Sequence, residues 1–178
     1  MAKLFVALDL PEAARAALVR LQPAAVPGIR LTESSQMHLT LHFIGEGEVE
    51  RYSAALARVS APAFPQSLEG VGQFPTAGGT TTLWAGVPPS PGLLQLREAA
   101  ATALGVEGFK PEARPYRPHL TLARCEPGFS PSVIEEFLRT NAEFAMRDVA
   151  MESFGLYTSS LVADVPVYRC ERTFPLRR

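Results

Sequence analysis

The sequence predicts an α+β protein in which a duplicated strand–helix unit forms two pseudo-symmetric lobes, with antiparallel sheets around a central cleft. The tetrapeptide His-Leu-Thr-Leu occurs twice, at residues 38–41 and 119–122. Each copy lies in a strand-like segment that is followed by a turn and then by a helix-like segment. An internal duplication explains both observations. We therefore expect residues 1–178 to form a single bilobal domain of two interleaved repeats, with one copy of the motif in each.

In the first half, apolar spacing and breaker residues predict alternating strands and helices. Residues 3–9 are a short apolar run that is typical of a buried strand, and a helix follows from Pro11 to near Leu21. A second helix carries acidic residues early and Arg58 late, as the helix dipole prefers. The other segments expected in this half are strands over 28–33, 36–45 and 64–75, that second helix over 47–60, and a turn with a strand over 76–87.

The second half repeats this rhythm. Ser90 and Pro91 mark the start of a helix, because proline suits the first helical position. Residues 106–116 are rich in proline and charge and are expected to be a loop. The last two strands are expected to pair as a hairpin through 160–164. The elements predicted here are helices over 90–104 and 130–141, and strands over 119–125, 144–159 and 165–174.

Composition and charge exclude several classes of protein. Of the 178 residues, 47% are hydrophobic and 20% are charged, and the formal net charge is −1. Long-range capture of a nucleic-acid duplex needs a strongly basic face, but a pocket for one phosphate remains compatible with this charge. No apolar run reaches about 18 residues, so no membrane span is expected. The two cysteines form no Cys-x-x-Cys pair and no signal peptide is recognisable, so a cytoplasmic protein is expected.

The duplicated motif places two polar side chains on one face of each strand. Side chains alternate along a strand, so the leucines are expected to be buried, while His38, Thr40, His119 and Thr121 face the cleft. Histidine titrates near neutral pH, so one imidazole can act as general base and the other as general acid. Two hydroxyls can hydrogen-bond a phosphate between them. This set suits an in-line displacement at phosphorus, and the residues alone leave open which histidine is the acid.

A single His-x-Thr pair on a strand is usually a half-exposed surface pair without function. Any repeat would duplicate its buried leucines, because both copies need a core. Packing does not require the polar pair on the opposite face to be duplicated as well. The repetition of that pair therefore favours a functional interpretation.

The two copies resemble the paired H-x-T-x motifs of the 2H phosphoesterase superfamily. More narrowly, the chain resembles the bacterial RNA 2′,3′-cyclic phosphodiesterases, also called 2′-5′ RNA ligases (the LigT or ThpR group). The segments "LFVALDLP", "MHLTLHFIGE", "LWAGV" and "YRPHLTLAR" stand in that family's order and spacing, and together they extend over almost the whole chain. The resemblance implies a bilobal fold of the kind predicted above.

The resemblance also implies roles for the motif residues. His38 would donate a proton to the leaving group, His119 would accept the proton of the attacking water, and Thr40 and Thr121 would bind the phosphate. The implied reaction is metal-independent hydrolysis of RNA 2′,3′-cyclic phosphate ends to 2′-phosphates, with 2′-5′ RNA ligation as the reverse activity. No cofactor is implied. The implied partners are RNA 3′ ends with the cyclic phosphate, for example on tRNA fragments, and a monomer is expected.

Further residues near the motifs are candidates for binding substrate. His42 shares the predicted face of Thr40. It is expected either to touch the phosphate or ribose of the substrate or to lie exposed to water at the rim of the cleft. Arg117 could pair with the phosphate charge and Tyr116 could stack a base. Arg124 is an odd number of steps from His119, so strict alternation turns it away from the cleft unless a bulge intervenes, although the family often has arginine there.

Two aromatic residues are more easily explained by packing. Phe43 could stack a base, but it has the core parity of Leu41. Trp84 is expected in the core.

Other functions would use parts of the same pattern. A metal site is not expected, because His38 and His42 would be about 13 Å apart on a strand and no cysteine or acidic cluster completes a set of ligands. Within the same chemistry, the substrate could be a small cyclic nucleotide or a 2′,5′-linked one. A nucleotide-binding or RNA-end-binding module would use the same cleft without turnover, and a structural interaction domain would make both histidines dispensable.

Overall fold

Within residues 2–163 and 165–178, which the computed structural model describes, ten strands alternate with four α-helices and one short 3₁₀ helix. The elements in chain order are β1 (Ala2–Leu8), α1 (Glu12–Leu21), β2 (Ile29–Leu31), the 3₁₀ helix η1 (Ser34–Gln36), β3 (Leu39–Gly47), α2 (Val49–Leu56), β4 (Phe64–Glu69), β5 (Val71–Pro75), β6 (Thr81–Gly86), α3 (Pro91–Gly105), β7 (His119–Cys125), α4 (Pro131–Thr140), β8 (Ala145–Met151), β9 (Ser153–Val162) and β10 (Val165–Pro175).

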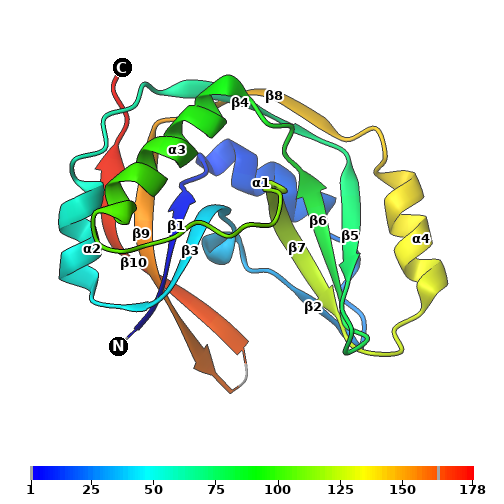
Figure 1. Cartoon of the computed structure of the whole chain (residues 1–178). Coiled ribbons are helices and arrows are strands. Elements are labelled where there is room, and N and C mark those ends of the chain that lie inside the picture. The colour runs from blue at the N-terminus through cyan, green and yellow to red at the C-terminus, as the bar shows by residue number, and fades with distance from the viewer. Residues whose placement is uncertain (1, 164) are drawn as a thin grey trace.

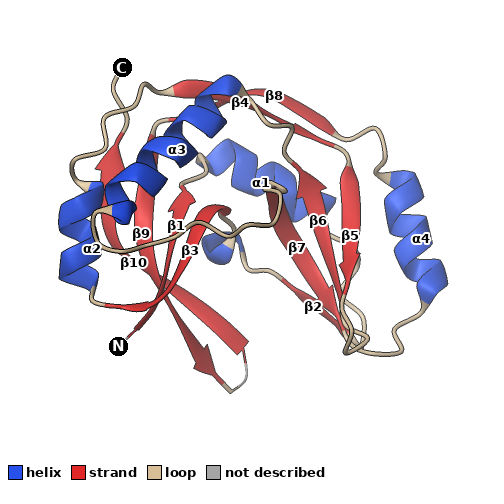
Figure 2. Ribbon diagram, in the orientation of Figure 1, coloured by secondary structure: helices blue, strands red, loops and turns tan. Residues whose placement is uncertain are grey.

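The strands form two four-stranded sheets and one two-stranded sheet within these ranges. One large sheet has the order β10-β9-β1-β3, the other has the order β2-β7-β6-β5, and β4 pairs with β8. All pairs within these sheets are antiparallel. Figure 1 shows α2 and α4 at opposite outer sides of the molecule, and the strands of the two large sheets between them. The predicted α+β class with antiparallel sheets is confirmed (Figure 2).

The chain passes repeatedly between the two large sheets. β1 and β3 belong to one sheet, although β2, which comes between them in sequence, belongs to the other sheet. The chain returns to the first sheet with β9 and β10. The two histidine motifs therefore lie in different sheets, on β3 and at the start of β7. The predicted hairpin of β9 and β10 is present, with Val162 opposite Val165. Its predicted turn includes residue 164, which lies outside the described residues.

The predicted helix starts agree with local chemistry. Ser90 precedes α3, and its hydroxyl oxygen accepts a hydrogen bond from the Leu93 amide at 3.1 Å, with Pro91 in the first turn. Pro131 likewise lies in the first turn of α4, but the side chain of Ser130 before it makes no capping hydrogen bond. No helix in the described part of the chain is both long enough and apolar enough to cross a membrane.

Two predicted strands are each divided between different sheets. Residues 64–75 form β4 and β5, which are separated at Gly70, where φ is +67° and a glycine is favoured. Residues 144–159 form β8 and β9, on either side of Glu152. The predicted strand 36–45 also begins later, at Leu39, and ends later, at Gly47. Alternation in a sequence indicates a strand but not its partner, so it cannot show where the chain changes sheets.

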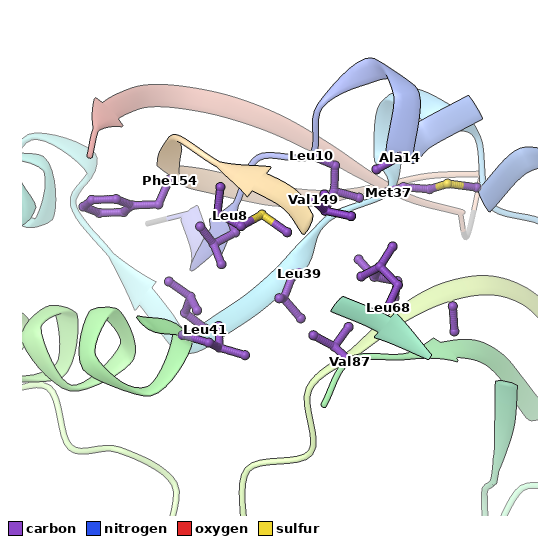
Figure 3. Packing of buried hydrophobic residues seen from close by; sticks show 14 of the residues in the cluster. Leu8, Leu10, Ala14, Met37, Leu39, Leu41, Leu68, Val87, Val149 and Phe154 are labelled. Atoms are coloured by element: carbon purple, nitrogen blue, oxygen red, sulfur yellow. The ribbon is translucent and has the colours of Figure 1, made fainter. Parts of the chain in front are cut away.

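The core joins the elements that carry the two motifs. All four motif leucines are at most 2% exposed, as the alternation predicts, and they are Leu39, Leu41, Leu120 and Leu122. Figure 3 shows Leu39 and Leu41 of β3 among Leu8, Leu68, Val87 and Phe154, which come from other strands and from the loop after β6. Burial of one face of each motif strand leaves the opposite face available for a cleft.

Candidate active site

A cavity of about 750 Å³ is lined by residues of both large sheets. His38 and Thr40 contribute to its wall from the first sheet and its entry segment, and His119 and Thr121 contribute from the second. The structure therefore brings together the four residues that the repeated motif predicts. The size suits a small ligand or the end of a polymer, because ligand pockets are typically about 300–1,000 Å³.

The two histidines are held in the same way. The Nδ1 atom of His38 lies 2.8 Å from the Gln36 carbonyl oxygen, and Nδ1 of His119 lies 2.7 Å from the Arg117 carbonyl oxygen. A carbonyl can only accept a hydrogen bond, so each Nδ1 carries a proton and donates. Nε2 of each ring is then left for a substrate, as an acceptor when the imidazole is neutral and as a donor when it is protonated.

Burial lowers the pKa of both imidazoles. The pKa of His38 falls from 6.5 to about 4 because burial penalises its charged form, and the positive charges of Arg15 and His119 add to this effect. Burial also lowers the pKa of His119, with Arg124 and Arg117 contributing further. In each case the hydrogen bond to the backbone carbonyl acts in the opposite direction. A bound phosphate anion would favour the protonated form of either ring.

Aromatic side chains support both imidazole rings. The ring of Tyr168 on β10 meets His38 edge-on, with the centroids 4.9 Å apart, and Phe5 on β1 lies 4.8 Å from His38 on another side. Phe74 on β5 meets His119 edge-on at 4.9 Å. Such contacts fix ring orientation and limit access of water to the ring faces.

Each motif strand has a β-bulge directly after its threonine. In β3, Thr40 lies opposite Ala7 and His42 lies opposite Val6, so Leu41 has no partner of its own in β1. In β7, Thr121 lies opposite Trp84 and residue 123 opposite Leu83, so Leu122 is the extra residue. The residue after each extra leucine is also buried, and the alternation resumes one position late. This shared irregularity supports the proposed duplication.

The bulge at Leu41 turns His42 away from the face that was predicted for it. Its side chain is only 4% exposed and does not line the cavity, so the expected face shared with Thr40 is wrong. Its Nε2 lies 2.8 Å from the Arg97 carbonyl oxygen of α3, and its ring meets Phe109 edge-on. Burial lowers the pKa of His42, as expected for an imidazole that is held neutral inside the protein.

His42 should therefore matter for stability rather than for chemistry. Replacing it by alanine leaves the Arg97 carbonyl without its partner and removes a buried ring, so we expect the free energy of unfolding to fall by about 1–3 kcal/mol. Urea unfolding of the variant and the wild type measures this difference. An unchanged unfolding midpoint would contradict the structural role.

The same bulges bring Phe43 and Arg124 into the cavity wall. Phe43 is 56% exposed, so its expected place in the core is wrong. Arg124 was expected in the cleft only if a bulge intervened between it and His119, and the structure has such a bulge at Leu122. Its guanidinium donates to the Thr82 hydroxyl of the neighbouring strand at 3.1 Å. Phe43 and Arg124 occupy equivalent positions, each three residues after its motif threonine.

Arg117 and Tyr116 lie beside the site without lining the cavity. The exposed Arg117 guanidinium lies 4.8 Å from the centre of the Phe74 ring, and the Arg117 carbonyl accepts the hydrogen bond from His119. The Tyr116 hydroxyl donates to the Thr40 carbonyl at 2.7 Å, and it ties the segment before β7 to β3. Tyr116 therefore links the segment before β7 to the first motif strand, whereas the Arg117 side chain packs on Phe74 of β5. Trp84, expected in the core, is half-buried and packs 5.0 Å from Phe74.

Several residues that shape the site were not predicted. The Gln36 side-chain amide pairs with the backbone of Tyr168, accepting from its nitrogen at 2.7 Å and donating to its oxygen at 3.3 Å. The β9–β10 hairpin is thereby joined to the segment that enters the His38 strand. Arg15 of α1 donates to the carbonyls of Ser34 and Met37 in that segment, at 2.6 and 2.7 Å. These contacts join residues up to 132 positions apart in the sequence, so no local sequence pattern predicts them.

Comparison with known proteins places this architecture in a family. A family model described as the 2′-5′ RNA ligase superfamily matches residues 10–155. An RNA 2′,3′-cyclic phosphodiesterase of Thermus thermophilus is 35% identical over 98% of this chain and 90% of its own length. The crystal structure of a Thermus thermophilus protein gives a TM-score of 0.77 at 29% identity and covers 98% of both chains. Escherichia coli LigT complexed with 3′-AMP gives 0.75 at 26% identity and covers 99% of both. The family model extends over most of the sequence, and this chain therefore belongs to the 2′-5′ RNA ligase superfamily.

Proposed function

We propose that the cavity hydrolyses the 2′,3′-cyclic phosphate at the 3′ end of RNA to a 2′-phosphate, with His38 and His119 as an acid–base pair. The chain is an enzyme of the RNA 2′,3′-cyclic phosphodiesterase class, because relatives of that name from Thermus thermophilus and Archaeoglobus fulgidus align with 98% and 97% of it. One observation carries the mechanism: two imidazoles with equivalent Nδ1 bonds line one cavity with two threonines.

The reaction assigns one proton transfer to each histidine. A water molecule attacks phosphorus in line with the 3′ oxygen, and one Nε2 accepts its proton. The bond from phosphorus to the 3′ oxygen breaks, and the other Nε2 donates the proton that this oxygen needs. The hydroxyls of Thr40 and Thr121 donate to the non-bridging oxygens, whose negative charge they stabilise.

The direction of proton transfer follows the family resemblance, with His38 as donor and His119 as acceptor. In the free protein, the pKa of about 4 makes His38 a poor donor at neutral pH. His38 can fill this role because the bound anion raises its pKa again. When a 5′-hydroxyl replaces water as the nucleophile, the same transfers form a 2′-5′ linkage, which is the proposed ligase activity.

Metal independence is part of the proposal. The two imidazoles supply both proton transfers, so no metal-bound water is needed. Within the described ranges, no group of three or more histidine, cysteine or acidic side chains could hold a metal ion. We further propose that the protein acts as a monomer and that tRNA fragments are among the RNAs that supply cyclic ends.

The product end tests this function. A short RNA with a 2′,3′-cyclic phosphate is incubated with the protein, and the new end is identified as a 2′- or 3′-phosphate. We expect the 2′-phosphate, since the 3′ oxygen is the proposed leaving group. A 3′-phosphate would contradict the geometry of attack. Tight binding without any turnover would instead favour a binding module.

The lowered pKa values predict an acidic optimum for kcat/KM. The productive free enzyme carries one proton on the pair of imidazoles, and in the assigned roles that proton is on His38. Because the pKa of His38 is only about 4, this is a minor form of the singly protonated enzyme, but its population rises and falls with pH together with that of the singly protonated pair. At low pH both rings are protonated and no base remains, while at high pH both are neutral and no acid remains, and burial lowers the pKa of both rings below the ordinary value of 6.5. Hydrolysis measured from about pH 3.5 to 9 should therefore give a bell with its maximum below about pH 6.5. A flat profile, or a maximum above about pH 7, would contradict the pair.

A further inference from the structure

The two halves of the site lie in different sheets, and a hydrogen bond joins them outside the cavity. The Tyr116 hydroxyl donates to the main-chain carbonyl of Thr40 at 2.7 Å. Tyr116 directly precedes Arg117, whose carbonyl accepts the hydrogen bond from Nδ1 of His119. Figure 1 shows the segment between α3 and β7 crossing from the side of β3 to β7. Adjacent residues of this segment therefore contact one motif residue of each sheet.

Thr40 lies where β3 is held by few strand contacts. In the part of the chain that the structure describes, β3 is the outer strand of its sheet, with β1 on one side only. Leu41, next to Thr40, is the extra residue of the bulge, and a bulge interrupts the hydrogen bonds of the ladder. The carbonyls of Thr40 and Leu41 both accept hydrogen bonds from side chains of other elements. Those side chains therefore help to fix the backbone that orients the Thr40 hydroxyl.

Arg97 of α3 braces both sides of this link. Its Nε donates to the Leu41 carbonyl at 3.3 Å, and its guanidinium carbon lies 4.3 Å from the centre of the Tyr116 ring. A guanidinium over an aromatic face is attracted by the ring. Among the residues that the structure describes, Arg97 makes no ion pair with a carboxylate. The contacts with Leu41 and Tyr116 are thus the ones that orient its guanidinium.

The Tyr116 hydroxyl stays a hydrogen-bond donor over the pH range of the reaction. Burial raises its pKa above the ordinary value of 10, although the positive charge of Arg97 acts in the opposite direction. The Tyr116 side chain is half-buried and does not line the cavity. Its hydroxyl can therefore act on the reaction only through the residues that it holds.

We propose that Tyr116, braced by Arg97, is a positioning residue that aligns the Thr40 hydroxyl with His119. This inference rests on the proposed function, in which Thr40 binds the phosphate and His119 takes part in proton transfer. The two groups come from different sheets, so their relative placement decides how the phosphorus is presented to the imidazole. Small errors in such placement are costly in rate. The hydroxyl of Tyr116 is then the functional group, rather than a ring that stacks on a base.

Removing only this hydroxyl tests the role. Tyr116→Phe should lower kcat/KM for a short RNA with a 2′,3′-cyclic phosphate by about three- to tenfold, as expected for one lost hydrogen bond. In the Thr40→Val background the same change should cost less than about twofold, because no hydroxyl remains there to be aligned. The matched control is Tyr52→Phe, since Tyr52 of α2 is also half-buried and does not line the cavity. The control should leave kcat/KM unchanged.

Arg97→Met tests the brace, because it removes the charge and the donor while it leaves both partners of the link in place. It should lower kcat/KM in the otherwise wild-type protein, and by a smaller factor in the Tyr116→Phe background. An equal factor in both backgrounds would show that Arg97 does not act through Tyr116.

The contrary results are distinct from one another. Unchanged kinetics of Tyr116→Phe, with activity lost in Tyr116→Leu, would assign the role to the ring and overturn the proposal. The same loss in the wild-type and Thr40→Val backgrounds would also overturn it, since a reduced folded fraction lowers both alike. If the wild type did not open the cyclic end, the proposed function itself would fail. The affinity for a nucleoside 2′-phosphate would then test the alignment without turnover, and Tyr116→Phe should weaken it only where Thr40 is present.

Discussion

Replacing either His38 or His119 by alanine lowers the rate of cyclic phosphate hydrolysis by about 10²–10⁴-fold, because each variant lacks one of the two proton transfers. Both rings line the same cavity, and each has only Nε2 free, because its Nδ1 is engaged with the carbonyl of Gln36 or Arg117. A single remaining ring therefore cannot act as acid and as base in the same reaction step. The kcat for a short RNA with a cyclic end, measured for both variants, gives the loss directly.

Two control variants accompany this measurement: one lacks both histidines of the pair, and the other lacks the histidine that lies outside the cavity. The variant that replaces both histidines should be little slower than the worse single variant, because groups that act as a unit are not additive. His42→Ala removes the third histidine, which lies outside the cavity, and its folded fraction should keep the wild-type kcat. If His38→Ala or His119→Ala stayed within about tenfold of the wild type, the acid–base pair would be wrong.

Replacing Thr40 or Thr121 by valine costs less, about 10–100-fold in kcat/KM, because each change removes one hydrogen bond to a charged phosphate and no proton transfer. Valine keeps the branched shape of threonine, so the strands should be little disturbed. The two single variants should show similar losses, since the residues have equivalent places in the two sheets. Steady-state kinetics on the cyclic RNA, with thermal unfolding as a check of folding, measure both.

Serine variants separate the hydroxyl from the methyl group at these positions. Thr40→Ser and Thr121→Ser keep the donor and should retain most of the activity that valine removes. Threonine variants slower than the histidine variants would reverse the proposed division of roles. Valine variants with unchanged kinetics would show that the hydroxyls do not bind the phosphate.

The face that each motif presents could be predicted from the sequence because alternation along a strand is a local property. Alternation over four residues places the leucines inward, and the structure buries all four of them. The same alternation failed one step later, at His42 and Phe43. A bulge depends on how two strands pair, and the sequence of β3 alone does not show that Leu41 lacks a partner in β1.

Other features depended on contacts between distant segments. The pairing of Gln36 with Tyr168 needs the position of the β9–β10 hairpin, and the hydrogen bond from Tyr116 to Thr40 needs the path of the segment before β7. The change of sheet at Gly70 was visible only as a glycine within a strand-like segment. Local patterns therefore predicted the four motif residues that share the cavity, whereas the other residues of its wall required the tertiary structure.

The central claim is that this cavity opens a cyclic phosphate with two imidazoles and without a metal. The most direct measurement is the rate of hydrolysis of a short RNA with a 2′,3′-cyclic phosphate end, by wild-type protein that has been dialysed against EDTA and assayed in its presence. We predict full turnover that added Mg²⁺ or Zn²⁺ does not increase. Turnover that disappears with EDTA and returns with a metal ion would contradict the claim.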